Sequence, residues 1–368
     1  MLPNSNPRAR RAAIVTLILV YAVILAGSVV RSTGAGMGCP DWPKCFGHYI
    51  PPTDISELQF EEGRHFKAGH FIIWENALWK AKHELVAGKE INPDDWEKYT
   101  KHDYAVFNAA HTWTEYINRL MGALLGIASV VMTIFSLRYW RQDRMIVFGS
   151  ILAVLLIGFE AWLGAVVVES NLEPVKITAH MIGALIIVGV VLWVVRRISA
   201  DTAAPVPAFS KATKWILGTA IVFTLVQTVL GTQVREEIDL VSALMNDQHR
   251  ATWIDQLGAY FKIHRSFAIA LLIVNGLAIV RLLKEAGGML RGKVIALAVV
   301  ILTSAGTGVA LAWFGMPAAA QPMHLLLAML LFGVQFDLLL LGTVRRRALS
   351  AISEKHEMAA SIQAPGMR

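Results

Sequence analysis

The sequence predicts an all-α polytopic membrane protein, in which eight transmembrane helices form two pseudo-symmetric four-helix bundles with cytoplasmic N- and C-termini. Of its 368 residues, 55% are hydrophobic and only 17% are charged, whereas soluble domains carry about 25% charged residues. The apolar residues fall in eight stretches of roughly 20 residues, each long enough to cross about 30 Å of hydrocarbon as a helix. This pattern excludes a soluble globule, a disordered chain and a disulfide-rich secreted scaffold, and the strands of a β-barrel would show shorter, alternating segments.

The eight apolar stretches are taken as the membrane spans in order along the chain. They are expected at about 12–30, 114–137, 145–168, 178–196, 214–232, 262–282, 294–314 and 322–344. The connections on the outward side are then 31–113, 169–177, 233–261 and 315–321.

The net charge of +7 is explained by where the basic residues lie. They gather before the first span, in every second connection and after the eighth span: Arg8, Arg10, Arg11; Arg138, Arg141, Arg144; Arg196, Arg197, Lys211, Lys214; Arg281, Lys284, Arg291, Lys293; Arg345, Arg346, Arg347. This is the positive-inside pattern, and loops longer than about 60 residues cross the membrane regardless of charge. The charge therefore predicts orientation in the lipid bilayer and no nucleic-acid partner.

The domain organisation follows from the spans and from one Pro/Ala-rich segment. We expect an N-terminal four-helix bundle over 1–200 with a long outward loop over 31–113, a cytoplasmic linker over 201–213, a second bundle over 214–345 and a polar tail over 346–368. The outward loop is too long to be structureless. Within it, the spacing of Trp74, Leu78, Trp79 and Lys82 favours a short amphipathic helix at the outer membrane interface.

The two groups of four spans carry an internal repeat. Gly27-Ser-Val-Val-Arg31 matches Gly231-Thr-Gln-Val-Arg235, and Asn118-Arg119 matches His264-Arg265. Leu163-Gly164-Ala165 matches Thr307-Gly308-Val309, and His180 matches His324, both at an offset of 144 residues. Because both groups run in the same sense across the membrane, the repeat is parallel, with its pseudo-twofold axis along the membrane normal.

Three histidines lie inside the apolar stretches, where histidine is rare and usually faces the interior of a bundle. His264 and His324 lie on helices of the second group at the same depth, and His180 lies at the equivalent place in the first group. Two imidazoles that face each other across a bundle bind a haem iron from both sides. The alternative is that each imidazole hydrogen-bonds a backbone carbonyl or another helix.

Arginines at the outer ends of the spans are candidates for binding the haem propionates, because guanidinium groups bind carboxylates bidentately. They are Arg31, Arg119, Arg235 and Arg265. The alternative is that these side chains extend to the lipid headgroups.

Glu115 is the most informative single residue, because a carboxylate at the mouth of an apolar helix needs a partner or a task. His111 and Arg119 lie four residues on either side, on the same helix face. A structural ion pair with Arg119 and a proton-handling or substrate-positioning acid are the two alternatives. Glu160 and Asp337 lie nearer the middle or inner half of their spans, away from the histidines, and we expect structural or proton-path roles for them.

Cys39 and Cys45 lie in the outward segment Gly-Cys-Pro-Asp-Trp-Pro-Lys-Cys, with five residues between them. In an oxidising compartment such a pair favours a small disulfide loop. A redox-active pair and two free thiols remain alternatives.

Taken together, these motifs resemble the heme A synthase family over about residues 12–345. The matching segments begin at Thr33, Glu115 and Gln227 (TGAGMGCPDWP, EYINR and QTVLGTQVR) and are joined by His264-Arg265, His180 and His324. The resemblance implies oxidation of the C8 methyl of haem O to a formyl group, giving haem A for terminal oxidases. It implies that His264 and His324 hold a b-type haem that relays electrons, that His180 binds the substrate haem iron, that Glu115 is the essential acid, and that Cys39 and Cys45 are the family's outward cysteine pair.

One position departs from the family pattern. Asn118 stands where the family usually has histidine, and asparagine is a poor iron ligand. Either His180 alone holds the substrate iron and leaves one side open, which suits oxygen activation, or His111 reaches in from one turn before Glu115.

Two other functions remain as alternatives. One is a di-haem membrane cytochrome b that passes electrons between quinol and a partner, which predicts paired histidines in both halves. The other is a transporter or assembly factor with structural histidines, which predicts a colourless protein. The expected partners are haem O, the enzyme that produces it, membrane lipid and an unidentified electron donor, and a homo-oligomer is left open.

Overall fold

The computed structural model of the protein describes residues 6–100, 106–170, 172–199, 208–246 and 248–362, with side chains except at 287, 289 and 343–362. The first part of the predicted linker, 201–207, and the side chains of the polar tail lie outside the described residues.

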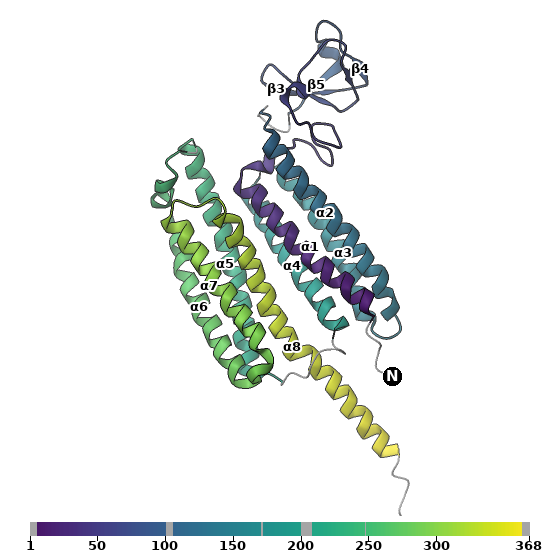
Figure 1. The fold of residues 1–368 in the computed structure, drawn as a ribbon, viewed down its shortest axis with the longest axis vertical. Helices are drawn as coiled ribbons and strands as arrows, with labels where there is room; N and C mark the ends of the chain where they lie inside the picture. The colour runs from purple at the N-terminus through teal and green to yellow at the C-terminus, as the bar shows by residue number, and fades with distance from the viewer. Residues whose placement is uncertain (1–5, 101–105, 171, 200–207, 247, 363–368) are drawn as a thin grey trace, which may run out of the picture. The chain divides into compact units, whose positions relative to one another are not determined.

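Eight helices of the described chain are long and apolar enough to cross a membrane, as predicted. In chain order they are α1 (Pro7–Ser32), α2 (Ala109–Ser136), α3 (Arg144–Glu169), α4 (Pro174–Ile198), α5 (Lys211–Leu244), α6 (Ala259–Ala286), α7 (Arg291–Trp313) and α8 (Ala320–Ile362) (Figure 1). Large apolar side chains on them stay exposed, such as Ile127 at 63% and Leu155 at 65%. Such exposure is expected of helices surrounded by lipid, so the chain is a multi-pass membrane protein.

Helix α5 continues twelve residues beyond the predicted end at 232. Its N-terminus is capped by Ser210, whose hydroxyl accepts a hydrogen bond from the Thr213 N–H at 3.1 Å. Near its other end, Arg235 pairs with Asp239 one turn later at 2.9 Å. This i,i+4 ion pair stabilises the helix beyond the apolar stretch. Hydropathy alone does not detect such a polar extension of a helix.

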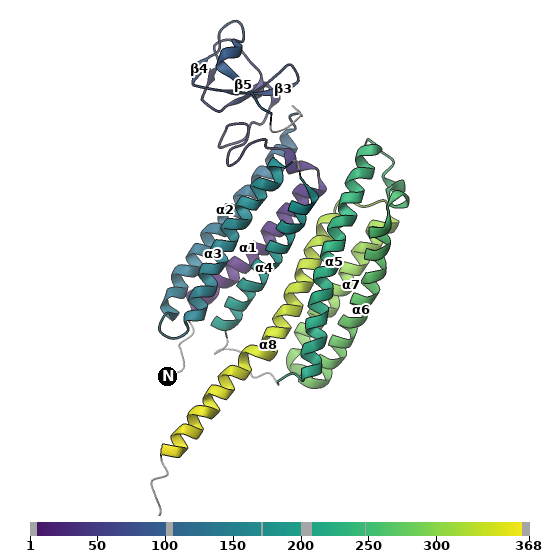
Figure 2. The ribbon, with the colours of Figure 1, turned by 180° about the vertical axis from the view of Figure 1, so that it is seen from behind.

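Helices α5–α8 form a four-helix bundle in which α5 packs on α6 and α8, and α7 packs on the same two helices (Figures 1 and 2). A buried polar chain crosses its apolar core. Gln335 accepts from the Thr224 hydroxyl and donates to Asn275, both at 2.9 Å. These hydrogen bonds link α5, α6 and α8. Because each of the polar groups has a partner, no buried donor among them is left unpaired.

Internal contacts divide the chain into two compact units. The larger unit comprises Met1–Tyr21, Ala128–Leu156 and Leu185–Arg368, and the smaller unit comprises Ala22–Ile127 and Ile157–Ala184. The organisation into halves 1–200 and 214–345, and their pseudo-symmetry, stay predictions. Within the larger unit, Asp337 of α8 pairs with Arg196 of α4 and, at 2.6 Å, with Lys293 of α7. These contacts favour the structural role for Asp337.

The segment between α1 and α2, which is predicted to lie on the outward side, holds short 3₁₀ helices and two small antiparallel sheets. The strands are β1 (His65–Phe66), β2 (Phe71–Trp74), β3 (Ala77–Ala81), β4 (Leu85–Val86) and β5 (Trp96–Lys98). Strand β1 pairs with β4, and β3 lies between β2 and β5. The 3₁₀ helices of the whole described chain are Ala35–Met37, Ile55–Leu58, Pro93–Asp95, Leu137–Tyr139, Arg250–Gln256 and Gly287–Leu290.

The amphipathic helix expected at Trp74, Leu78, Trp79 and Lys82 is wrong, because Trp74, Leu78 and Trp79 belong to the β2–β3 hairpin. Glu75 and Asn76 form its two-residue turn, both with positive φ (49° and 57°), as type I′ hairpin turns require. Trp74 and Trp79 are diagonal neighbours on one face, with ring centroids 5.0 Å apart. Trp74 and Leu78, four residues apart, would share a helix face, so the spacing of the set did not exclude a helix.

Candidate functional site

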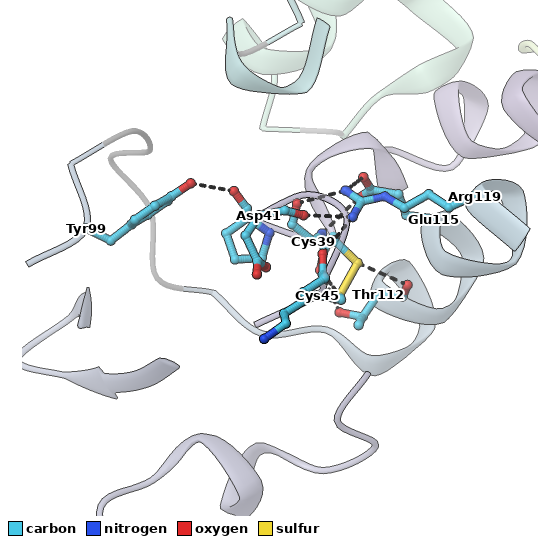
Figure 3. A network of polar contacts seen from close by, with 10 residues as sticks. Cys39, Asp41, Cys45, Tyr99, Thr112, Glu115 and Arg119 are labelled. Carbon is cyan, nitrogen blue, oxygen red and sulfur yellow. Dashed lines mark hydrogen bonds and ion pairs between the residues drawn. A yellow bond between two sulfur atoms is a disulfide. The ribbon is translucent and has the colours of Figure 1, made fainter. Parts of the chain in front are cut away.

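Glu115 lies on the second turn of α2, whose start is set by a side-chain cap. The Asn108 carboxamide oxygen accepts hydrogen bonds from the N–H groups of Ala110 and His111 at 3.0 and 3.2 Å. From this start, Thr112, Glu115 and Arg119 fall on one face of the helix. Their side chains are directed at the loop that carries Cys39 and Cys45 (Figure 3).

Glu115 is 3% exposed, and both of its carboxylate oxygens are engaged. Oε2 accepts a hydrogen bond from the backbone N–H of Cys39 at 2.8 Å, and Oε1 pairs with Nη2 of Arg119 at 2.6 Å. The other guanidinium nitrogen of Arg119 donates to the carbonyl oxygens of Asp41 and Lys44 at 2.7 and 2.8 Å. The ion pair between Glu115 and Arg119 therefore belongs to a network that fastens the loop to the helix (Figure 3).

The predicted disulfide between Cys39 and Cys45 is present. Its loop is held by the Thr112 hydroxyl, which donates to the Gly38 carbonyl at 2.8 Å, and by the Tyr99 hydroxyl, which donates to the Pro40 carbonyl at 2.6 Å. Burial raises the pKa of Tyr99 to about 12. Burial also raises the pKa of Asp41, and the Gly47 N–H and the Arg119 charge oppose that rise.

Gly38 is required by the close approach of the loop to α2. A Cβ at this position would lie 2.6 Å from the carbonyl carbon and oxygen of His111. We expect Gly38→Ala to lower the free energy of unfolding by about 1–3 kcal/mol, because backbone must move to admit the methyl group. Thermal unfolding of the full chain in detergent measures this. Gly88→Ala is the matched control, since a Cβ there meets nothing within 4 Å, and equal melting of the two variants would contradict the prediction.

Glu160 of α3 does not lie away from the histidines, contrary to the expectation from sequence. Its Oε2 is 2.6 Å from Nδ1 of His180 on α4. The Glu160 side chain is 10% exposed and that of His180 is 42% exposed. The ring N–H is not aligned for a regular hydrogen bond to the oxygen, so the contact is best described as a close charge–imidazole approach. The expectation failed because it considered how deep each residue lies along its helix. It did not consider the direction in which each side chain leaves the helix, which depends on the rotation of the helix about its axis.

Asn118 and His111 are the other first-half candidates, and both lie in the smaller unit with His180. The Asn118 Oδ1 atom is buried without a hydrogen-bond partner, and it faces Gly27, where a Cβ would lie 3.7 Å from it. His111 is half-buried in the first turn of α2. Iron binding by His111 stays a prediction.

His264 of α6 and His324 of α8 approach each other inside the larger unit. Their ring centroids are 6.3 Å apart and the rings are inclined by 71°. A metal bound by one nitrogen of each ring at about 2 Å would place the ring centroids about 6 Å apart, so the spacing would allow the pair to hold one metal.

The hydrogen bonds around these two rings also fit a haem. His324 Nδ1 lies 3.0 Å from the Ser304 carbonyl oxygen and 2.9 Å from the Thr307 hydroxyl. Donation from Nδ1 to the carbonyl leaves Nε2 as the atom with a free lone pair, which is how metal-binding histidines are usually held. His264 Nε2 is 3.3 Å from the Gln227 amide nitrogen, and its buried Nδ1 has no hydrogen-bond partner.

A glycine lies against each of the four repeat-related positions. A Cβ on Gly231 would be 3.3 Å from His264, and one on Gly308 would be 3.1 Å from His324. In the first half, Gly164 faces His180 at 3.6 Å, and Gly27 faces Asn118 in the same manner. The repeat found in the sequence therefore recurs as contacts within each unit.

The four arginines proposed for propionates have different surroundings. Arg119 is engaged by the loop, Arg235 contacts Gln321 as well as Asp239, and the Arg265 guanidinium lies 5.7 Å from the Phe261 ring centroid. Arg31 lies in the last turn of α1. Propionate binding by these residues stays a prediction.

Sequence reasoning missed the residues that hold the imidazoles, namely Glu160, Ser304, Thr307 and Gln227. One signal could have found Glu160 and Ser304. Glu160 lies one turn before Gly164, and Ser304 lies one turn before Gly308, so both share a helix face with the glycine that contacts a histidine.

Comparison with known proteins gives one family. The family model of the cytochrome oxidase assembly proteins (COX15-CtaA) matches residues 10–83 and 79–336. The chain is similar to proteins called heme A synthase. It is 22% identical over 365 residues to that of Methylorubrum populi, covering 89% of this chain and 86% of the relative. For Rhizorhabdus wittichii the identity is 23% over 364 residues, covering 89% and 92%.

A third heme A synthase, from Shewanella oneidensis, is 27% identical over 183 residues. This match covers 50% of the chain and 43% of the relative, less than half of that protein's length.

Proposed function

Since this chain belongs to the heme A synthase family of cytochrome oxidase assembly proteins, we propose that it oxidises the C8 methyl of haem O to the formyl group of haem A. Similarity to heme A synthases supports a role in heme A biosynthesis. One observation above the others supports assigning a resident haem to one site and the substrate haem to the other. The two repeat-related sites have different side chains, a histidine pair in the second and Asn118 with His180 in the first.

The second site is assigned to a resident haem b between His264 and His324. The orphaned Nδ1 of His264 and the carbonyl-held ring of His324 fit this group. A haem with two imidazole ligands supplies one-electron transfer. Gly231 and Gly308 leave room beside the rings that side chains would fill. An unidentified donor supplies the electrons.

The first site is assigned to the substrate, haem O. His180 binds its iron, and Asn118 leaves the opposite side without an imidazole, which suits oxidation chemistry better than closed ligation does. With O₂ as the oxidant, two successive hydroxylations, each consuming two electrons and two protons and releasing one water, would convert the methyl group to a geminal diol, which loses water to leave the aldehyde. Glu115 is the acid that handles protons or orients the methyl group, and the network with Arg119 and Cys39 holds its carboxylate in place.

The test is production of haem A by cells that make haem O but lack any other heme A synthase. Expression of the full chain is expected to yield a protein with Soret absorbance and an extractable haem that carries a formyl group. A colourless protein would support structural histidines instead. Bound haem with no formyl product would support the di-haem cytochrome b.

A further inference from the structure

Glu160 and His180 are adjacent in the smaller unit, and the proposed function above gives Glu160 no task. The Glu160 carboxylate is in a membrane span, where an ionisable group is costly unless it has a partner or a function. Its nearest titratable contact is Nδ1 of His180, 2.6 Å from Oε2. Because Nδ1 is buried while the side chain as a whole is 42% exposed, the exposed part of the ring is its remaining atoms.

The fold makes room for this carboxylate through Gly183 of α4. A Cβ at Gly183 would lie 1.7 Å from Oε1 of Glu160 and 2.6 Å from its Cδ. The carboxylate therefore occupies the space that any other residue at 183 would fill. Gly183, one turn after His180, therefore leaves the space in which the Glu160 carboxylate approaches the imidazole ring. A residue with a Cβ at this position would block that approach.

The equivalent place in the second half is built differently. The offset of 144 residues that relates His180 to His324 also relates Glu160 to Ser304 and Gly183 to Leu327. There the ring Nδ1 faces a neutral backbone carbonyl, that of Ser304 at 3.0 Å. The two equivalent imidazoles therefore have an anionic neighbour in one half and a neutral neighbour in the other.

The neighbour of a ligating imidazole affects the metal. A carboxylate close to the second ring nitrogen favours the tautomer that carries its proton on that nitrogen, and it raises the basicity of the ligand. Hydrogen bonding beyond the axial ligand is also one of the levers that set haem potential. We propose that Glu160 is a positioning residue for His180, holding Nε2 unprotonated for the iron of haem O and adding negative charge that His324 lacks. This inference rests on the proposed function, since it needs haem O at His180.

The first test is binding of haem O to the full chain in detergent, with haem b already in place. Loss of an outer partner of a metal ligand typically costs 10–100-fold in affinity. We expect Glu160→Gln to weaken haem O binding by about tenfold and Glu160→Ala by up to about 100-fold. The midpoint potential of bound haem O should rise in both, because a nearby negative charge stabilises ferric iron. The haem b spectrum should not change, which also shows that the variants fold.

The second test moves Glu160 without altering it or His180. Gly183→Ala is expected to weaken haem O binding as Glu160→Ala does, because the methyl group displaces the carboxylate. Gly158→Ala on the same helix as Glu160 is the control, since a Cβ there meets nothing within 4 Å. In a His180→Ala background, Glu160→Gln should cause no further loss, because Glu160 acts through the imidazole.

The inference would be overturned if Glu160→Gln and Gly183→Ala bound haem O with wild-type affinity and with a wild-type midpoint potential. It would also be overturned if Glu160→Gln caused a further, additive loss of haem O binding in the His180→Ala background. These results leave the proposed function intact. A wild-type chain that binds haem O but makes no formyl product removes the proposed function while the Glu160 effect on binding stands. A wild-type chain that binds no haem O overturns both.

Discussion

Replacing Glu115 with Gln is expected to lower haem A production by about a hundredfold or more, while haem b stays bound. General acid–base groups contribute typically 10²–10⁴-fold to rate. The change keeps the shape of the side chain and removes its charge and one acceptor. Arg119 would still be held by the carbonyl oxygens of Asp41 and Lys44. The loop should therefore stay attached to α2, and the loss should be in chemistry. The measurement is chromatography of extracted haem together with the visible spectrum.

Glu173→Gln is the matched control for this change. Glu173 of the smaller unit also pairs with a basic residue, Lys176 at 2.8 Å, but its side chain is 50% exposed. Exposed pairs contribute little to stability, so this variant should make haem A at the wild-type level. Undiminished haem A from Glu115→Gln would refute the role of Glu115. Loss of haem b in that variant would instead point to the structural ion pair as its main role.

Replacing His324 with Ala is expected to abolish the low-spin b-type spectrum, and haem A production with it. The ring is the only part of residue 324 that offers iron a nitrogen, and its tautomer is set by the Ser304 carbonyl. His264→Ala should have the same effect, because an axial pair needs both rings. The measurement is the reduced-minus-oxidised spectrum of the purified full chain.

A histidine outside the spans provides the control for these two variants. His83 lies in the outward segment with a side chain 57% exposed, 3.3 Å from Asp95. His83→Ala should leave the spectrum unchanged. An unchanged spectrum in His264→Ala or His324→Ala would reject the ligand pair and favour histidines that only join helices.

The helices and the histidine pair were predictable because the relevant information is local. A stretch of about 20 apolar residues must form a helix to satisfy its backbone in lipid. His264 and His324 each lie at the start of a predicted span, which places them at one depth. The disulfide was predictable as one of three alternatives, because two cysteines so close in an outward segment are free to meet.

The outward sheets were not predictable by the same reasoning. Trp74 and Leu78, four residues apart, satisfy helical spacing, but they lie on the two strands of a hairpin whose turn residues, Glu75 and Asn76, have positive φ. A short segment of this kind takes its conformation from the turn and from the clusters on its two faces. Phe71 and Leu78 pack with Cys39 and Cys45 on one face, which hydropathy along the chain does not reveal.

By itself, the sequence determined the eight spans, the repeat and the residue types available to a haem, because these depend on apolar length and on identity. The tertiary structure alone decided that Glu115 is bound to the Cys39 backbone and that Glu160 is directed at His180. Both contacts join residues on different segments. The physical reason is rotation: a helix may turn about its axis without changing its hydropathy, and only packing, here the space at Gly38 and Gly183, selects the partner of each carboxylate.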